Sequence, residues 1–348
     1  MSTKRVTSRD VARLAGVSRT TVSFVLNHTP GMQISEETRQ RVFAAAKELG
    51  YEPNAAAQAL ASRRSQAMGL IIIRSPYQVS TDAFLNQMLN GIVAVAQAHH
   101  MRLLLDIVER EHQEQTYLQL ARAKRIDGLI LAGPRFDDVA LEGLVRQNFP
   151  TVLIGAMPGV PFASVDVHNS TAAQQAVTHL INLGHRRIGC ITNAPPSYNA
   201  AVERLQGYRQ ALEAAGIPYD EALVRYGDFD PESGHNQMQS LLHEKPLISA
   251  VFVASDVLAV GAMAAINERG LRIPQDMALV GYDDVPFARY LNPPLTTVRL
   301  PATELGARAA EMLVQLIHHE TLPETDVRLE AHLVVRASCG AQTATPRP

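Results

Sequence analysis

The sequence predicts an α/β protein with a small three-helix N-terminal domain, a hinge helix and two doubly wound parallel α/β lobes. Three observations lead to this prediction. Charge of opposite sign separates along the chain, the first fifty or so residues carry short capped helical patterns, and the remainder alternates apolar strands with helices. At roughly 150 residues per domain, 348 residues allow two or three domains.

The net charge of −2 conceals a basic segment. Residues 1–66, called the head below, contain ten Lys and Arg against five Asp and Glu, or +5. The remainder, called the body, has 22 against 29, or −7. A basic head on an acidic body indicates a polyanionic partner for the head alone.

Several classes of protein are disfavoured by what the sequence lacks. Cys190 and Cys339 cannot form a disulfide framework, and no Cys/His cluster has metal-ligand spacing. No nucleophile elbow, phosphate-binding loop or dinucleotide fingerprint is present. We expect no cofactor, no metal and no enzymatic activity. The N-terminus lacks the apolar core of a signal peptide and no segment is long enough to span a membrane, so a soluble cytoplasmic protein without a membrane partner is expected.

The head shows two short helices joined by a tight turn. Thr7 and Asp10 form a capping-box pattern that begins the first helix, and Gly16 ends it. Ser18 can cap a second helix over residues 19–26, which completes a helix-turn-helix pattern. A third helix begins at Ser35-Glu36-Glu37 and ends at Gly50. The expected apolar positions of the first and third helices are Val11, Ala12, Leu14, Ala15, Ile34, Val42, Phe43, Ala46 and Leu49.

The second helix begins with side chains suited to DNA. Arg19 can donate to guanine edges, and Thr20 and Thr21 can contact a thymine methyl or a phosphate. Residues 53–64 follow, with Pro53, a capping Asn54 and an alanine-rich run of about two helical turns. Such a helix is too short to be stable alone in water and needs a partner to fold.

The body alternates buried strands and helices, which is typical of parallel sheets covered on both faces. The series is too long for one sheet and indicates two lobes, with Gly155–Ser164 and Asn292-Pro293-Pro294 as expected crossings. The expected strands lie at 69–73, 103–105, 128–131, 152–154, 188–191, 250–253 and 278–280, and the expected helices at 84–98, 117–123, 171–183, 203–215 and 257–269.

Ligands of doubly wound sheets bind at the carboxyl ends of strands, and a cleft between two lobes is a favourable pocket. Polar and aromatic side chains just beyond expected strands are therefore candidates. They are Arg110, Phe229, Ser255, Asp256, Asp283 and Asp284, with Arg204 near the start of the helix after residues 188–191.

Over essentially its whole length the chain resembles the lactose-repressor/galactose-repressor family of bacterial transcription regulators. The resemblance rests on TSRDVARLAGVSRTTVSFVLN, on SEETRQRVFAAAKELGYEPNAAAQALAS and on the body motifs above. It implies a hinge helix that pairs with its dimer mate on operator DNA and inserts Leu60 as a wedge into the minor groove; the alternative is that Leu60 packs on the body. The DNA-contacting positions that it implies are Thr7, Ser18, Arg19, Thr20, Thr21, Ser23, Phe24, Asn27, Tyr51, Asn54, Ala57 and Leu60. Many relatives have a polar side chain at the position of Phe24, so Phe24 either meets a thymine methyl or faces the protein interior.

The resemblance also implies an effector cleft like that of type I periplasmic sugar-binding proteins. Arg204 would clamp ligand oxygens, Asp283 would accept hydroxyl hydrogen bonds and Phe229 would lie under the ligand. The alternatives are a structural Arg204–Asp283 ion pair and a plain core role for Phe229. The implied ligand positions are Phe84, Arg110, Arg204, Phe229, Ser255 and Asp283. Gly155 stands where some relatives have an acidic ligand-binding residue.

The expected protein is therefore a dimeric regulator, most simply a repressor, that binds a palindromic operator under the control of a small molecule. A sugar or sugar acid is the favoured effector and a purine the alternative; whether the effector releases or recruits the protein is left open. A transport receptor and an enzyme on the same body are the competing classes. The expected segments are a head domain at 1–52, a hinge at 53–66, a body at 67–340 and a tail at 341–348 without the leucine heptads of a tetramer. Within the body, lobe one is expected at about 67–163 and 293–322, and lobe two at about 164–292 and 323–340.

Overall fold

The computed structural model describes residues 6–26, 32–52, 64–108, 113–244 and 248–341. The chain divides into two compact units, residues 1–66 and 67–348. This boundary is the same as the one between the basic segment, residues 1–66, and the acidic remainder, so the two units are the head and the body. Each unit is described separately.

The head contains α1 (Ser8–Ala15), α2 (Arg19–Leu26) and α3 (Glu36–Leu49). Thr7 and Asp10 form the capping box of α1, in which the Thr7 backbone N–H donates to Asp10 at 3.0 Å. Gly16 ends α1 with a φ of 66°, a left-handed conformation that costs glycine little. Ser18 accepts from the Thr21 N–H at 3.0 Å and caps α2. The predicted helix boundaries in the head therefore agree with the structure.

The core of the head consists of small and β-branched side chains from all three helices. Val11, Val25 and Val42 are inaccessible to solvent. Two expected core positions are wrong: Leu14 is 47% exposed and Phe43 is 41% exposed. Both neighbour a buried position in sequence, and successive helical residues point about 100° apart, so a narrow core covers only one of each pair.

The first lobe of the body is built on a sheet of six described strands in the order β11-β5-β4-β3-β1-β2, all parallel. The strands are β1 (Ala67–Ile73), β2 (Arg102–Val108), β3 (Gly128–Ala132), β4 (Thr151–Ile154), β5 (Ala163–Val167) and β11 (Asp326–Leu329). The inner strands are wholly buried, as their uninterrupted apolar sequences predict. The helices of this lobe are α5 (Pro76–Thr81), α6 (Ala83–Ala98), α7 (Gln113–Arg122), α8 (Ala140–Arg146) and α13 (Ala302–Ile317).

The second lobe has a sheet of six described strands in the order β12-β10-β9-β8-β6-β7, in which β12 alone is antiparallel. The strands are β6 (Ile188–Thr192), β7 (Val224–Tyr226), β8 (Ala250–Val253), β9 (Ala278–Asp283), β10 (Thr296–Arg299) and β12 (His332–Val334). The helices are α9 (Asn169–Asn182), α10 (Asn199–Ala214), α11 (Pro231–Leu241) and α12 (Asp256–Glu268), with 3-10 turns η2 (Glu221–Leu223), η3 (Ala288–Tyr290) and η4 (Ala337–Cys339).

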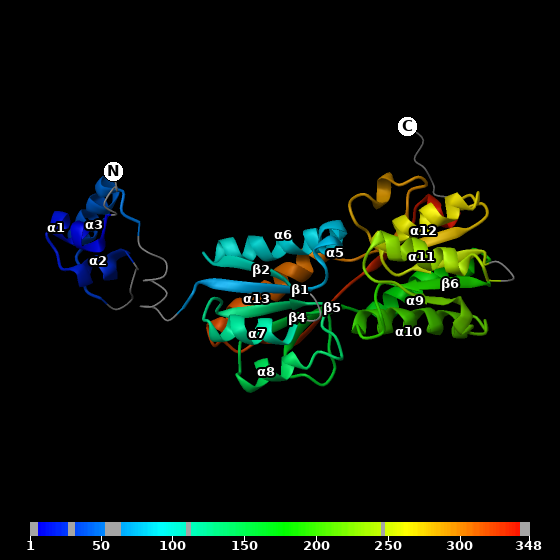
Figure 1. The fold of residues 1–348 in the computed structure, drawn as a ribbon, viewed down its shortest axis with the longest axis horizontal. Coiled ribbons are helices and arrows are strands. Elements are labelled where there is room, and N and C mark those ends of the chain that lie inside the picture. Colours follow the sequence, from blue (N-terminus) through cyan, green and yellow to red (C-terminus); the bar gives the residue numbers. More distant parts are fainter. Residues whose placement is uncertain (1–5, 27–31, 53–63, 109–112, 245–247, 342–348) are drawn as a thin grey trace. The chain divides into compact units, whose positions relative to one another are not determined.

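The described chain passes between the lobes at three places: after β5, between β10 and α13, and between β11 and β12 (Figure 1). The predicted crossings at Gly155–Ser164 and Asn292-Pro293-Pro294 are wrong. So are the predicted lobe boundaries, because β5 and β11 belong to lobe one and β10 to lobe two. The glycine and proline residues at these places form turns within a lobe. The strand after each turn, β5 or β10, pairs with the strand that precedes the turn.

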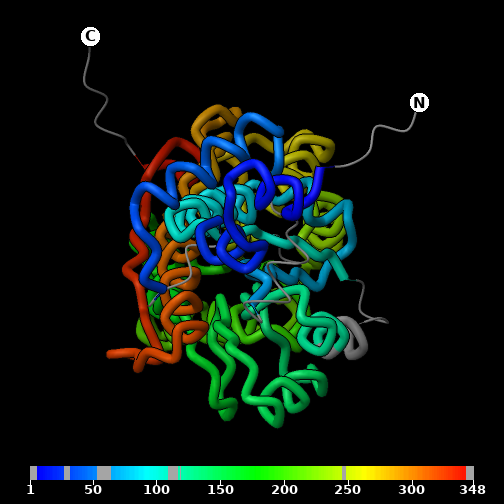
Figure 2. The backbone as a smooth tube through the Cα atoms, turned by 90° about the vertical axis from the view of Figure 1, so that its left-hand side faces the viewer, coloured from blue at the N-terminus to red at the C-terminus, as the bar shows by residue number. Residues whose placement is uncertain are grey.

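Helices distant in the sequence pack in pairs on the sheets. The helices α6 and α13 lie together on lobe one, cyan and orange in Figures 1 and 2. In lobe two α9 packs on α10, and α11 packs on α12. These pairs bury the opposite faces of the sheets and leave the carboxyl ends of the strands free to form a site.

Candidate functional site

The predicted DNA-contacting residues of the head that the structure describes differ in exposure. Thr7, Ser18, Arg19 and Thr20 are exposed at the starts of α1 and α2. The side chain of Thr21 is half-buried and lies 2.9 Å from the Ser18 hydroxyl. The start of α2 thus presents a long cation and hydroxyl groups to solvent, the set that a major groove accepts.

Other predicted head residues face the protein or lie outside the described residues. Ser23 and Phe24 are half-buried, and Tyr51 packs against the core of the head. The remaining positions, which include the expected wedge, lie outside the described residues. They are Asn27, Asn54, Ala57 and Leu60.

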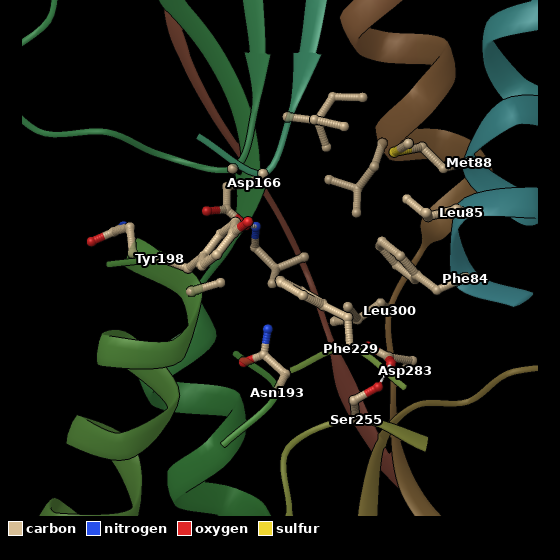
Figure 3. A pocket seen from close by; sticks show the side chains of 18 of the residues that line it. Phe84, Leu85, Met88, Asp166, Asn193, Tyr198, Phe229, Ser255, Asp283 and Leu300 are labelled. Atoms are coloured by element: carbon tan, nitrogen blue, oxygen red, sulfur yellow. Dashed lines mark hydrogen bonds between the residues drawn. The ribbon is translucent and has the colours of Figure 1, made fainter. Parts of the chain in front are cut away.

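A cavity of about 90 Å³ lies in the body, lined by both lobes (Figure 3). Five of the six predicted ligand residues line it, and the sixth, Arg110, lies outside the described residues. The five are Phe84, Arg204, Phe229, Ser255 and Asp283. Lobe one adds apolar side chains from α6, α13 and the segment before α13, which are Leu85, Met88, Leu300 and Leu305. The structure brings the predicted residues together, and their roles toward a ligand stay predictions.

Arg204 is held in place by three elements of lobe two. Its Nε donates to Asn169 Oδ1 at 3.0 Å, and its Nη1 donates to the Ala254 carbonyl at 2.7 Å. The guanidinium lies over the Tyr282 ring, 3.9 Å from the centroid. Nη1 is 3.8 Å from Asp283 Oδ1, so the ion pair is loose and carries no hydrogen bond. Arg204 is therefore fixed in position, while its contact with Asp283 is longer than a hydrogen bond.

Asp283 ends β9 with a φ of 118°, a conformation that L-residues rarely adopt. Ser255 at the start of α12 donates its hydroxyl to Asp283 Oδ2 at 3.0 Å. Burial raises the pKa of Asp283 to about 7, against the opposing effects of Arg204 and the Ser255 hydrogen bond. Burial, with the charge of Asp283 next, also raises the pKa of the neighbouring Asp256. Asp283 is thus a carboxyl group that titrates near neutrality and would gain from a hydroxyl donor.

Phe229 follows β7 with a φ of 60°, and its N–H donates to the Asn193 carbonyl at 3.0 Å. The edge of Tyr198 meets its ring at a centroid distance of 4.9 Å and an interplanar angle of 78°. Phe84, at the start of α6, lines the cavity from lobe one (Figure 3). The cavity therefore has an aromatic side chain from each lobe.

Gly155 also lines the cavity, after β4. Its φ is 101°, and an added Cβ would come within 3.0 Å of the Pro134 ring. This backbone conformation favours glycine, and a side chain at this position would be strained and would press on the Pro134 ring.

The sequence prediction missed several polar residues of the cavity, among them Arg74, Asp82 and Asn193. Asn193 is 6% exposed, and its Oδ1 accepts no hydrogen bond from the described residues. Arg74 donates to Asp82 at 2.6 Å, and both side chains are largely buried. Arg74 and Asn193 directly follow β1 and β6, so the rule that selected the residues after other strands would have found them.

The chain thus combines a helix-turn-helix head with a two-lobed body whose cavity is lined by polar, aromatic and apolar side chains. Two family models match the chain. "Bacterial regulatory proteins, lacI family" matches residues 7–54, and "Periplasmic binding protein-like domain" matches residues 177–339.

Relatives match along nearly the whole chain. The HTH-type transcriptional regulator CelR of Thermobifida fusca is 38% identical over 96% of this chain and 98% of that protein. The transcriptional repressor CytR of Escherichia coli K12 is 34% identical over 96% of each. The chain therefore belongs to the lacI family of bacterial regulatory proteins.

Solved structures agree with this assignment. The lac repressor dimer bound to operator and the anti-inducer ONPF superposes with a TM-score of 0.85 at 32% identity, covering 97% of this chain and all of that one. A CelR–cellobiose complex gives a TM-score of 0.75 at 37% identity, covering 96% and 100%.

The protein is thus a DNA-binding transcriptional regulator with an effector-binding body, and not an enzyme. In the part of the chain that the structure describes, none of the helices has the length and apolar character needed to cross a membrane.

Proposed function

We propose that the chain is a dimeric repressor of a palindromic operator whose DNA affinity is set by a neutral sugar bound between the lobes. The observation that supports this most directly is the convergence of Phe84, Arg204, Phe229, Ser255 and Asp283 on one cavity. An operator-binding role puts the protein with the chromosome, in the bacterial cytoplasm.

The two sides of the cavity favour a sugar. Lobe one supplies an apolar wall that includes Leu85 and Met88, while lobe two supplies Arg204, Asp283 and Asn193. A sugar has both an apolar C–H surface and hydroxyl groups that donate and accept hydrogen bonds. A hydroxyl donated to Asn193 Oδ1 would also relieve a buried acceptor, whose unmet hydrogen bond costs about 1–3 kcal/mol.

The charges around the cavity favour a neutral ligand over an anionic one. Arg74 is paired with Asp82, and Arg204 faces Asp283. Asp166 accepts from the Ala156 and Val167 N–H groups and the Asn169 amide. Among the described residues that line the cavity, each arginine therefore faces a carboxylate, which favours a neutral ligand over a carboxylate or a phosphate.

A purine is the second candidate. Aromatic rings from both lobes, Phe84 and Phe229, line the cavity and would suit a flat heterocycle. The relatives include the repressor PurR of Edwardsiella ictaluri, 36% identical over 95% of this chain and 96% of that protein.

On the DNA side, the exposed start of α2 would enter the major groove with Arg19 and Thr20. Two-fold symmetry of a dimer would match two inverted half-sites. The similar lac repressor binds its operator as a dimer. The hinge residues 53–64 would then pair only on DNA.

The experiment uses the full-length protein. An operator is first selected from random duplex DNA, and its symmetry is read from the selected sequences. Calorimetric titrations then use cellobiose, glucose, gluconate and adenosine as probes.

Binding of a neutral sugar that changes operator affinity supports the proposal. Binding of adenosine alone would show that the effector is a purine and not a sugar. Binding of gluconate alone would contradict the inference that the cavity favours a neutral ligand. Selection of asymmetric sites would contradict the two-fold model.

A further inference from the structure

Residues 73–78, from the last residue of β1 into α5, contact lobe two at Ile73, Arg74 and Gln78. The Ile73 carbonyl accepts from the Tyr198 hydroxyl at 3.3 Å. Gln78 Nε2 donates to the Asp228 carbonyl at 2.8 Å. Both contacts cross from lobe one to lobe two, so this segment ties the lobes together beside the cavity.

Arg74 lies between these two contacts and covers Phe229. Its Cζ is 3.5 Å from the centroid of the Phe229 ring, which is the distance of direct stacking. Asp82 orients the guanidinium by accepting a hydrogen bond of 2.6 Å from Arg74 Nη1. The ring is only 7% exposed, with Arg74 over its face and Tyr198 in a T-shaped contact with it.

Arg74 therefore covers the face of the Phe229 ring on which a ligand would stack. The cavity that remains, about 90 Å³, is below the roughly 300–1,000 Å³ of small-molecule sites. A sugar ring can stack on Phe229 only after the guanidinium moves away, and that movement also enlarges the cavity.

We propose that Arg74 is an internal occupant of the Phe229 ring face, which clamps the lobes together and which the effector must displace. The proposal rests on the proposed function, because it takes Phe229 to be the surface on which the effector stacks. Arg74 therefore has two opposing effects. It favours the closed arrangement of the lobes, and it competes with the effector, so the residue at position 74 sets the effector concentration at which the regulator responds.

Two properties separate Arg74 from a merely structural arginine. The contact crosses the lobes, so its loss should favour their separation. The contact also covers the ring, so its loss should strengthen binding of a ligand that needs the ring. Gln78 shares the first property and lacks the second, which makes it a matched comparison.

The test uses full-length protein and the double variant Arg74→Met/Asp82→Asn. Removing both partners avoids leaving the Asp82 carboxylate buried and unpaired. Gln78→Ala is the variant that breaks another contact between the lobes. Arg146→Met, at an exposed position on α8, controls for the loss of an arginine.

Lobe separation is measured without any ligand, by hydrogen exchange of the Phe136 amide. This N–H donates to the Ser197 carbonyl across the lobes at 2.9 Å, so its exchange reports their opening. We expect exchange about 30-fold faster in Arg74→Met/Asp82→Asn, a size set by a desolvated cation–π contact. We also expect faster exchange in Gln78→Ala and no change in Arg146→Met.

Ligand competition is measured by calorimetric titration with cellobiose and glucose. The double variant should bind whichever sugar the wild type binds about 30-fold more tightly. Gln78→Ala should bind it equally or more weakly, because it opens the lobes without freeing the ring.

Unchanged Phe136 exchange in the double variant would overturn the clamp. Equal or weaker sugar binding by that variant, with normal binding by the wild type, would overturn the displacement while leaving the proposed function intact. If neither protein binds either sugar, the proposed effector class fails, and the exchange rate alone decides the role of Arg74.

Discussion

Replacing Asp283 by Asn should abolish much of the effector affinity while leaving the DNA affinity of the effector-free protein unchanged. The amide keeps the shape of the carboxylate and removes its charge. Asp283 faces the cavity, with Ser255 Oγ at 3.0 Å and Arg204 Nη1 at 3.8 Å. A hydrogen bond to a charged group is worth about 1.5–3 kcal/mol, which corresponds to roughly a 10- to 150-fold loss of affinity.

The assay is calorimetric titration of the sugar identified in the probe screen, paired with fluorescence anisotropy of labelled operator. Asp256→Asn is the control because Asp256 is equally buried, on the same side of lobe two, but does not line the cavity. Its carboxylate accepts from the Thr297 hydroxyl at 2.6 Å and the Val285 N–H at 3.0 Å. It should change thermal stability more than effector affinity. Wild-type effector affinity in Asp283→Asn, with the fold intact, would refute the assignment of Asp283 to the effector.

Further predictions concern pH, a second polar contact and the hinge. Because burial raises the pKa of Asp283 to about 7, the native state holds a proton that the unfolded state has lost between about pH 4 and 7. The contribution of this group to the free energy of unfolding should therefore decrease as pH rises through that window. In Asp283→Asn, the free energy measured by urea unfolding should lack this decrease between about pH 4 and 7. Sugar affinity should decrease as pH falls below 7, by up to about tenfold per unit, if the ionised carboxylate accepts from the ligand; affinity independent of pH from 5 to 8 would contradict this. Asn193→Leu should weaken sugar binding by about 0.5–1.5 kcal/mol while raising thermal stability, because a buried acceptor without a partner is removed; unchanged sugar affinity would exclude Asn193 from the site. Leu60→Ala should weaken operator binding and reduce the operator bend but preserve weak non-specific binding, measured by anisotropy and gel mobility; an unaltered bend would disprove the wedge.

The sequence predicted the elements whose signals are local. Thr7, Gly16 and Ser18 set the helix boundaries of the head through side-chain caps and a left-handed turn, and these depend on a few neighbouring residues. The buried strands were found because both faces of a parallel sheet are covered, so their sequences are continuously apolar. Helix faces were predicted less well, as Phe43 shows, since the width of the stripe that a small core covers is a tertiary property.

The errors concern long-range pairing. Residues 326–329 pair with β5 of the first sheet although residues 323–340 were expected in lobe two. No local pattern specifies that partner, because parallel pairing joins strands separated by more than 150 residues here. The same holds for Arg74, whose sequence neighbours give no sign that Phe229 lies beneath it.

The sequence predicted which side chains line the candidate site better than it predicted their conformation, burial and pKa. Ser255 and Asp283 were selected because they lie at the ends of expected strands, and strand ends meet at one edge of a parallel sheet. Arg204 was selected near the start of the following helix, and the roles of Arg204, Phe229 and Asp283 toward a ligand came from the family resemblance. The left-handed backbone at Phe229 and Asp283, and the raised pKa of Asp283, depend on burial that only the folded structure defines.

The most direct test of the account is whether a molecule in the cleft sets operator affinity. Anisotropy of labelled operator should be measured for wild type and Asp283→Asn, with and without saturating sugar from the probe screen. At a sugar concentration that just saturates wild type, the account predicts a change of about 5- to 150-fold in operator affinity for wild type and a much smaller change for Asp283→Asn. For wild type it also predicts an equal reciprocal effect of operator on sugar affinity. The same change in both proteins, or none in wild type when sugar is bound, would contradict it.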